Sequence, residues 1–198
     1  LYILSLPMQV RKDRQAELEQ ALQKSARQVL YKAPLKLDRV AAVLDCSYSA
    51  SGSSEKRRRP LGVALGAHYL LQLAAQEYQV FWTIPVQEPL LVQERGQTDL
   101  ATPLLHALAW GANLVVIVSD GCDNDPPQGA AEVLRIYREK LDPQRRVSII
   151  HCNPVFNPED FSLRPLSPLI PTVGLREAED LPTMLGFARF AEGNTSLV

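Results

Sequence analysis

The chain has 198 residues, of which 46% are hydrophobic and 22% are charged, and its formal net charge at pH 7 is −1. This length accommodates one globular domain with a sizeable core. The near-neutral charge gives no overall electrostatic signature of nucleic acid binding, and no apolar stretch approaches the ~20 residues that span a bilayer. Membrane insertion is therefore not expected.

The first part of the chain begins with an apolar stretch at residues 1–6 and continues with a helical pattern over residues 11–31. The apolar start has neither a basic leader nor a cleavage site, so we expect no signal peptide within it. The sequence also does not begin with Met, so we interpret it as a piece of a longer protein or of one with a leader that is not part of this sequence. Pro34 ends the helix. We expect residues 1–36 to form a strand and helix extension packed on the domain, which comprises residues 37–198.

Strand and helix patterns alternate through the rest of the chain. In chain order, we expect a strand at 40–44, a largely buried helix at 61–77, strands at 80–84 and 90–92, a helix at 100–110, a strand at 114–118, a helix at 130–140, a strand at 147–150, an edge strand at 171–173 and a helix at 178–191. This alternation indicates a Rossmann-like α/β fold, a doubly wound, mostly parallel sheet with helices on both faces.

Oxygen-bearing side chains follow the first buried strand of the expected sheet. Asp45 comes directly after the apolar residues 40–44, and Ser47 and Ser49 follow at alternate positions. Open α/β sheets hold their ligands at the edge where the strands end. Carboxylate and hydroxyl oxygens match a hard cation such as Mg²⁺. The alternative is a polar turn in which these side chains cap the next segment.

A further hydroxyl and a further acid come later in the chain. Thr98 lies in a turn before the helix at 100–110, and Asp120 comes just after the buried strand at 114–118. If the two buried strands are neighbours, Asp45 and Asp120 meet at one edge of the sheet. Two bare carboxylates at such a distance repel each other unless a cation or a proton lies between them.

The pattern of Asp45, Ser47 and Ser49, then Thr98, then a strand-terminal Asp120 resembles the metal-ion-dependent adhesion site of von Willebrand factor A domains. Over roughly residues 20–152, the chain is similar to the C-terminal A domain of TROVE (Ro-type ribonucleoprotein) proteins. The segments that carry this second similarity are the helix before the Asp45 strand, that strand itself and the Gly-Gln-Thr-Asp-Leu segment around Thr98.

The resemblance implies that Ser47, Ser49 and Thr98 bind Mg²⁺, or Mn²⁺ or Ca²⁺, directly, and that Asp45 and Asp120 act directly or through waters. A cation with few carboxylate ligands keeps one position for an Asp or Glu of a partner protein. The implied function is a non-enzymatic interaction module within a larger intracellular protein or ribonucleoprotein, so that RNA is a further partner through the parent protein.

An enzyme is the alternative. Asp45 and Asp120 would then hold Mg²⁺ for phosphoryl transfer or hydrolysis. The sequence lacks a second Asp two residues after Asp45, a Gly-rich phosphate loop and a Gly-x-Ser-x-Gly frame around Ser47. We therefore expect no enzymatic activity.

A basic run follows the first motif, and it consists of Lys56, Arg57, Arg58 and Arg59. One interpretation is a solvated loop. The other is a partner-binding rim, which attracts an acidic partner or RNA phosphates to the metal site.

The three cysteines each follow an expected strand. Cys46, Cys122 and Cys152 could therefore cluster with His151 at the sheet edge, where thiolates and imidazole would select Zn²⁺. The odd number and the lack of a Cys-x-x-Cys pair favour free cysteines of a reducing compartment, hence a cytoplasmic protein.

Other polar residues have plainer interpretations. His68 and His106 fall in helical segments and are interpreted as packed histidines. Asp99, Asp123 and Asp125 lie close to the expected ligands in sequence and are interpreted as caps of turns and helix starts.

Overall fold

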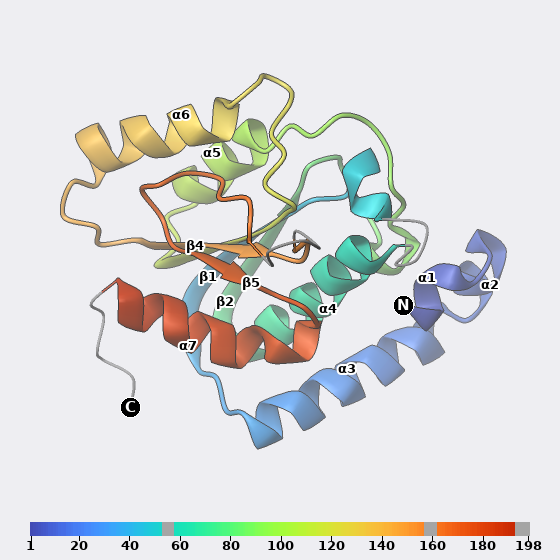
Figure 1. The fold of residues 1–198 in the computed structure, drawn as a ribbon. Coiled ribbons are helices and arrows are strands. Elements are labelled where there is room, and N and C mark those ends of the chain that lie inside the picture. Colours follow the sequence, from blue (N-terminus) through green and yellow to red (C-terminus); the bar gives the residue numbers. More distant parts are fainter. Residues whose placement is uncertain (53–57, 157–161, 193–198) are drawn as a thin grey trace.

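The structure is a computed structural model that describes residues 1–52, 58–156 and 162–192. Within these residues, five strands form one all-parallel sheet in the order β2-β1-β3-β4-β5 (Figure 1). The strands are β1 (Leu37–Leu44), β2 (Ala75–Trp82), β3 (Leu114–Val118), β4 (Ser148–Asn153) and β5 (Thr172–Gly174). The predicted doubly wound, Rossmann-like α/β class is confirmed.

Helices cover both faces of the sheet. The helical elements are α1 (Tyr2–Ser5), α2 (Met8–Asp13), α3 (Gln15–Lys32), α4 (Arg59–Ala74), α5 (Ala101–Ala109), α6 (Gly129–Ile136) and α7 (Leu181–Ala191), with short turns η1 (Tyr48–Ser51), η2 (Pro89–Leu91), η3 (Tyr137–Leu141) and η4 (Ala178–Asp180). Figure 1 shows α5 and α6 on one face and α3, α4 and α7 on the other. None of the helices in the described ranges is both long and apolar enough to cross a bilayer.

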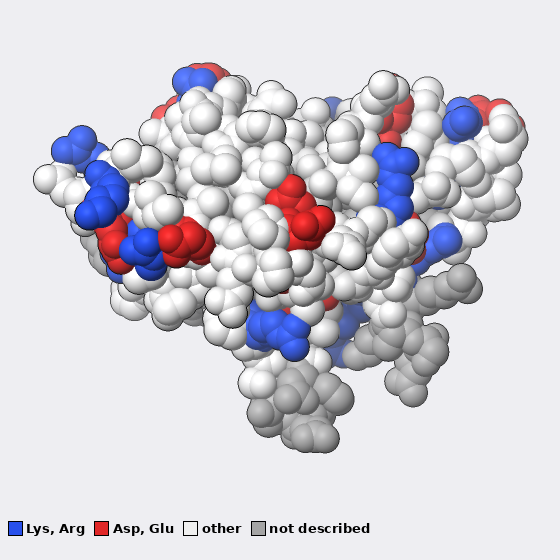
Figure 2. All heavy atoms as spheres, turned by 90° about the horizontal axis from the view of Figure 1, so that it is seen from above, with Lys and Arg blue, Asp and Glu red and all other residues white. Residues whose placement is uncertain are grey.

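Charged side chains are mixed on the surface above α5 and α6. Figure 2 shows basic and acidic side chains there in small interspersed groups. On α6, Arg135 forms ion pairs with Glu132 and Glu139 at 2.7 and 2.6 Å. This face therefore carries no broad field of one sign, in keeping with the net charge of −1.

The apolar run 40–44 forms the centre of β1 because both of its faces are covered. Val40, Ala42 and Leu44 pack in the core on the α4 side, whereas Ala41 and Val43 pack in the core on the α5 and α6 side. A strand that is buried on both faces needs apolar residues at successive positions rather than at alternate ones. Within the sheet, β1 lies between β2 and β3, so both of its edges are also paired.

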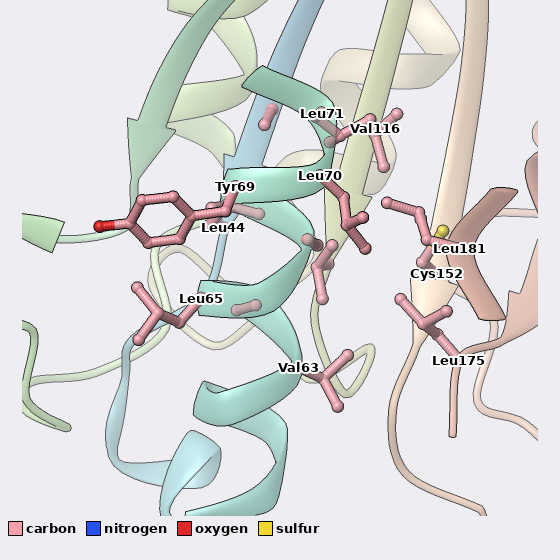
Figure 3. Packing of buried hydrophobic residues seen from close by; sticks show 14 of the residues in the cluster. Leu44, Val63, Leu65, Tyr69, Leu70, Leu71, Val116, Cys152, Leu175 and Leu181 are labelled. Carbon is pink, nitrogen blue, oxygen red and sulfur yellow. The ribbon is translucent and has the colours of Figure 1, made fainter. Parts of the chain in front are cut away.

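Helix α4 lies directly against the sheet, which explains why it is apolar on most sides. Figure 3 shows Leu70 and Leu71 of α4 beside Leu44, Val116 and Cys152 of the strands. Its other side is covered by α3 and by the η4 turn. The η4 turn comes so close that a methyl group added at Gly66 would lie 2.5 Å from the Cβ of Ala178. No side chain fits between α4 and the η4 turn at this position, so glycine is required there.

The structure corrects three expected elements. The helix expected at 61–77 ends at Ala74, and β2 begins at once with Ala75. Residues 2–5 form a helical turn rather than a strand. The strand expected at 90–92 is a 3₁₀ turn, and two of its carbonyl oxygens accept hydrogen bonds from the buried Arg11 guanidinium rather than from a neighbouring strand.

Candidate metal centre

Asp45 lies where β1 leaves the sheet beside β3. Its backbone N–H donates to the carbonyl oxygen of Val118 at 3.0 Å, so the parallel pairing continues one residue beyond β1. Asp120 follows Val118 by two residues and is partly exposed, whereas Asp45 is buried. The two acids therefore follow adjacent strands at the carboxyl edge of the sheet, as the sequence predicted.

Three hydroxyl groups form a chain of hydrogen bonds at this edge. The Thr98 hydroxyl donates to Ser47 Oγ at 2.8 Å, and Ser47 Oγ lies 2.9 Å from Ser49 Oγ. Ser47 and Thr98 are buried, and Ser49 is partly buried. Fold topology thus brings together two loops that are far apart in the sequence, with their hydroxyl oxygens at contact distance.

The first loop is shaped by Asp45 itself. Its Oδ1 accepts the backbone N–H of Ser47 at 2.8 Å, which is the turn that an Asp side chain makes with the residue two positions later. The same oxygen accepts the hydroxyl of Thr83 at 3.3 Å, and Thr83 Oγ1 in turn accepts the Cys46 N–H at 3.0 Å. Thr83 therefore helps to hold the loop in place.

Sequence reasoning missed Thr83 because it assigned this residue to the interior of a strand at 80–84. In the structure β2 ends at Trp82, next to β1, and Thr83 is the first residue beyond it. The usable signal was a hydroxyl at the end of an apolar strand that neighbours β1.

The second loop is fixed to the loop that follows Asp120. The carbonyl oxygen of Thr98 accepts the backbone N–H groups of Asn124 and Asp125, each at 3.1 Å. Asp120 Oδ1 accepts the Cys122 N–H at 2.8 Å, which closes a turn like that of Asp45. Three loops, which follow β1, β3 and the η2 region, therefore meet at one edge.

Burial raises the pKa of Asp45 above its ordinary value. The Ser47 N–H opposes this rise by stabilising the carboxylate, while the negative charge of Asp120 adds to it. A carboxylate that is both desolvated and close to a like charge is stabilised by a cation held between the two acids.

The donor set fits a hard divalent cation. Asp45, Ser47, Ser49, Thr98 and Asp120 offer carboxylate and hydroxyl oxygens, which suit Mg²⁺ and Mn²⁺ better than soft metals. Over the described ranges, no group of three or more His, Cys, Asp or Glu side chains could hold a metal ion. This set differs from such a group because it contains only two acids, and its other oxygens are the hydroxyls of Ser47, Ser49 and Thr98.

The neighbouring acids have separate structural roles. Asp99 Oδ1 accepts the Thr102 N–H at 2.9 Å in the first turn of α5, and Asp123 Oδ2 accepts the Ala130 N–H at 2.6 Å in the first turn of α6. Their interpretation as helix caps is confirmed. Asp125 is exposed and contributes its backbone N–H to the Thr98 loop.

The cysteines are free. Cys46 and Cys152 are buried, and Cys122 is partly exposed. The buried His151 ring hydrogen-bonds to the carbonyl oxygen of Ser119 at 3.1 Å instead of facing a thiolate. A thiolate and imidazole cluster is therefore not formed by these residues.

The two helical histidines differ from each other. His68 is buried as expected, with Nδ1 2.8 Å from the Tyr78 hydroxyl, and burial lowers its pKa to about 4. His106 is exposed on α5, with its ring centroid 6.4 Å from that of Phe81. The expectation of a packed histidine is wrong for His106.

The basic run is only partly placed. Lys56 and Arg57 lie outside the described residues, and their role as a partner-binding rim stays a prediction. Arg58 donates from Nε to Glu94 Oε1 at 2.9 Å and from Nη1 to the carbonyl oxygen of Leu4. This guanidinium is therefore bound within the fold.

Arg59 is also held by intramolecular contacts. Its Nε donates to the carbonyl oxygen of Arg176 at 3.1 Å and lies 3.8 Å from a carboxylate oxygen of Glu177. The two described arginines of the run thus hold together distant segments of the fold, in addition to any role they have at a rim.

The fold and this edge define a doubly wound, parallel α/β domain with an oxygen-lined turn at the carboxyl ends of two adjacent strands. No family model matches the chain, and no curated protein matches it. The likeness to von Willebrand factor A domains and to the TROVE branch stays a prediction.

Proposed function

We propose that this chain is a divalent-cation-dependent protein-interaction module of the von Willebrand factor A type. Asp45, Ser47, Ser49, Thr98 and Asp120 hold Mg²⁺, or Mn²⁺ or Ca²⁺, and an Asp or Glu of a partner protein completes the coordination shell. The observation that carries this proposal is the chain of hydroxyls from Thr98 through Ser47 to Ser49, beside two acids that follow adjacent strands.

The charge of the site supports a docking role. The two carboxylates together carry no more negative charge than is needed to neutralise a divalent cation, and the hydroxyls add none. The ion therefore keeps an affinity for one more carboxylate, and Mg²⁺ readily combines one or two protein carboxylates with exchangeable ligands. A partner Asp or Glu supplies this carboxylate, so the bound metal joins the two proteins.

The surroundings favour docking over hydrolysis. His151 lies near Asp120, where a general base would be useful, but it is fully buried. One ring nitrogen lies 3.1 Å from Thr172 Oγ1, and the other lies 3.1 Å from the Ser119 carbonyl oxygen. A general base must reach a substrate proton, and both ring nitrogens of this imidazole already have hydrogen-bond partners within the protein.

The wider setting of the module is part of the proposal. We place it in the cytoplasm, within a larger protein whose other parts provide any RNA binding. The support for the cytoplasm is the presence of three free cysteines. The support for a ribonucleoprotein is the resemblance of roughly residues 20–152 to the TROVE branch.

Thermal unfolding with and without metal tests the proposal. The wild type should gain melting temperature in millimolar Mg²⁺ or Mn²⁺, since a ligand that binds only the folded state stabilises it by about 2.7 kcal/mol at 100 times its Kd. Asp45→Ala should show no such gain. Asp38→Ala is the matched control, because Asp38 is an exposed acid near the other end of β1.

Two other outcomes would overturn the proposal. Metal-dependent turnover of a phosphoester by the wild type, lost in Asp45→Ala, would establish the enzyme instead. A wild type that gains nothing from either metal would leave the motif as a capped turn.

A further inference from the structure

Arg58, the residue before α4, joins three separate segments of the chain. Its backbone N–H donates to the carbonyl oxygen of Ser51 at 2.5 Å, at the end of the η1 turn that follows Ser47. Its side chain donates to Glu94 Oε1 at 2.9 Å and to the carbonyl oxygen of Leu4 in α1. We call the loop that carries Asp45, Ser47 and Ser49 the first metal loop, and the loop that carries Thr98 the second metal loop. Arg58 therefore joins the first metal loop, the segment that leads to the second metal loop, and α1.

The segment that begins at Glu94 runs beside the first metal loop. Two backbone hydrogen bonds join them, from Arg95 N–H to the Cys46 oxygen at 3.0 Å and from Tyr48 N–H to the Gly96 oxygen at 3.1 Å. Thr98 follows two residues later and reaches Ser47. The position of the Thr98 hydroxyl therefore depends on where residues 94–96 lie.

The backbone of Arg58 adopts an unfavourable conformation. Its φ of 59° lies in the left-handed region, which disfavours residues with a side chain. Its partner Glu94 is well buried, with 13% of its side chain exposed, so the ion pair is partly shielded from water. A strained residue of this kind persists where its surroundings determine its position.

The N-terminal helices also hold the start of the same segment. Arg11 of α2 is buried, and its Nη1 donates to the carbonyl oxygens of Leu90 and Val92 at 3.0 and 3.1 Å. Residues 90–94 are thus held at one end by Arg11 and at the other end by Arg58. Arg11 belongs to α2, and Arg58 is hydrogen-bonded to α1.

We propose that Arg58 is a positioning residue of the metal site and that docking of α1 and α2 sets the metal affinity through Arg58 and Arg11. This inference rests on the metal site proposed above. The N-terminal helices hold residues 90–96 against the first metal loop, so that the Thr98 and Ser47 hydroxyls lie together before metal binds.

The test compares variants of neighbouring residues in the full chain. We call the Arg58–Glu94 ion pair the clasp. Arg58→Gln removes the guanidinium and both of its side-chain hydrogen bonds, whereas the isosteric Glu94→Gln removes only the negative charge of the pair. Arg59→Gln is the matched control. Arg59 begins the same helix and also bonds to a backbone carbonyl and a Glu, but its partners are Arg176 and Glu177 rather than the metal loops. Mn²⁺ affinity is measured for each variant, alongside hydrogen exchange of the Arg95 and Tyr48 amides.

We expect both clasp variants to bind Mn²⁺ about tenfold more weakly, which is typical when a group that supports metal ligands is lost. Arg59→Gln should keep the wild-type affinity even where its melting temperature falls. In the clasp variants the Arg95 and Tyr48 amides should exchange faster than in the control.

Each contrary result has a distinct meaning. Equal Mn²⁺ affinity in all four proteins would overturn the positioning role and leave the metal site intact. A wild type that does not bind Mn²⁺ would overturn the metal site itself. Amide exchange at Arg95 and Tyr48 that is the same in Arg58→Gln and Arg59→Gln would reject the clasp whatever the metal result.

Discussion

Asp45 donates its backbone N–H to the carbonyl oxygen of Val118 across 3.0 Å. This bond extends the pairing of β1 and β3 to the point where both strands end in polar residues, so the Asp45 and Asp120 loops leave the sheet together. Two acids held in this way repel each other through a poorly hydrated region. Without a bound cation, this edge of the sheet is therefore expected to be a point of local instability.

Asp45→Asn, unfolded without metal, tests the cost of the buried Asp45 charge. Burial and Asp120 raise the pKa of Asp45, so its charged form is disfavoured in the folded state. Stability contributed by this group is present at low pH and is lost as pH rises through the folded-state pKa. Asn removes the charge and keeps an oxygen for Ser47. We expect urea unfolding at pH 7 in a chelator to show Asp45→Asn as stable as the wild type or more stable.

A clear loss of stability in that experiment would mean that the Asp45 charge is satisfied without metal. The control is Asp38→Asn, which changes an exposed acid on the same strand and should leave the free energy of unfolding unchanged.

Thr98→Val tests the hydroxyl chain. The substitution removes the hydrogen bond to Ser47 but keeps the side-chain shape, and the carbonyl oxygen of Thr98 still accepts from the loop at Asn124. We expect a stability cost of about 1 kcal/mol and a weaker effect of Mg²⁺ on melting temperature. The exposed Thr102→Val should leave the metal effect unchanged. A full Mg²⁺ effect in Thr98→Val would exclude its hydroxyl as a ligand.

The sequence predicted this edge well where local pattern decides the structure. The apolar residues 40–44 followed by Asp45 predicted a buried strand with its acid at the edge, because burial on both faces requires such a run. The chain also showed that Thr98 precedes a helix. Both features depend on neighbours in the sequence, and both were found.

Long-range contacts decided what the sequence could not show. Arg58 reads as one charge of a solvated basic run, yet its partners lie at residues 4, 51 and 94. Thr83 reads as a strand residue until the end of β2 is known. The boundary between α4 and β2 was missed because Ala74 and Ala75 contain no helix-breaking residue.

His68 predicts a dependence of stability on pH. Its folded-state pKa of about 4 lies below the ordinary value of 6.5, so the unfolded chain takes up a proton first as pH falls. Stability from neutral His68 is therefore present above pH 6.5 and is lost between about pH 6.5 and 4. We expect His68→Gln to lose about 2 kcal/mol less than the wild type between pH 7 and 5.

Urea unfolding at the two pH values measures this difference. The exposed His106→Gln is the matched control. Equal pH dependence in His68→Gln and the wild type would show that His68 takes up its proton within the folded state.

Arg138 supports the start of β4, at the end of the strand away from the candidate metal site. Its guanidinium is 3% exposed and donates to Asp142 at 2.7 Å and to the Val147 carbonyl oxygen at 2.9 Å. Arg138→Met leaves the buried Asp142 carboxylate with the Arg146 and Val147 N–H donors but without an opposite charge, so we expect a loss of about 3–5 kcal/mol. Arg135→Met removes exposed ion pairs on the neighbouring helix and should cost less than about 1 kcal/mol. Similar losses in the two variants would contradict the burial of this pair.

Counting bound Mn²⁺ by electron paramagnetic resonance tests the central claim most directly, because the free ion gives a signal that disappears on binding. We expect one Mn²⁺ per wild-type chain, displaced by excess Mg²⁺, with the bound ion lost in both Asp45→Asn and Asp120→Asn. Asp38→Asn should bind as the wild type does. Wild-type protein that leaves the Mn²⁺ signal unchanged, or binding that survives in Asp45→Asn and Asp120→Asn, would contradict a metal site at this edge of the sheet.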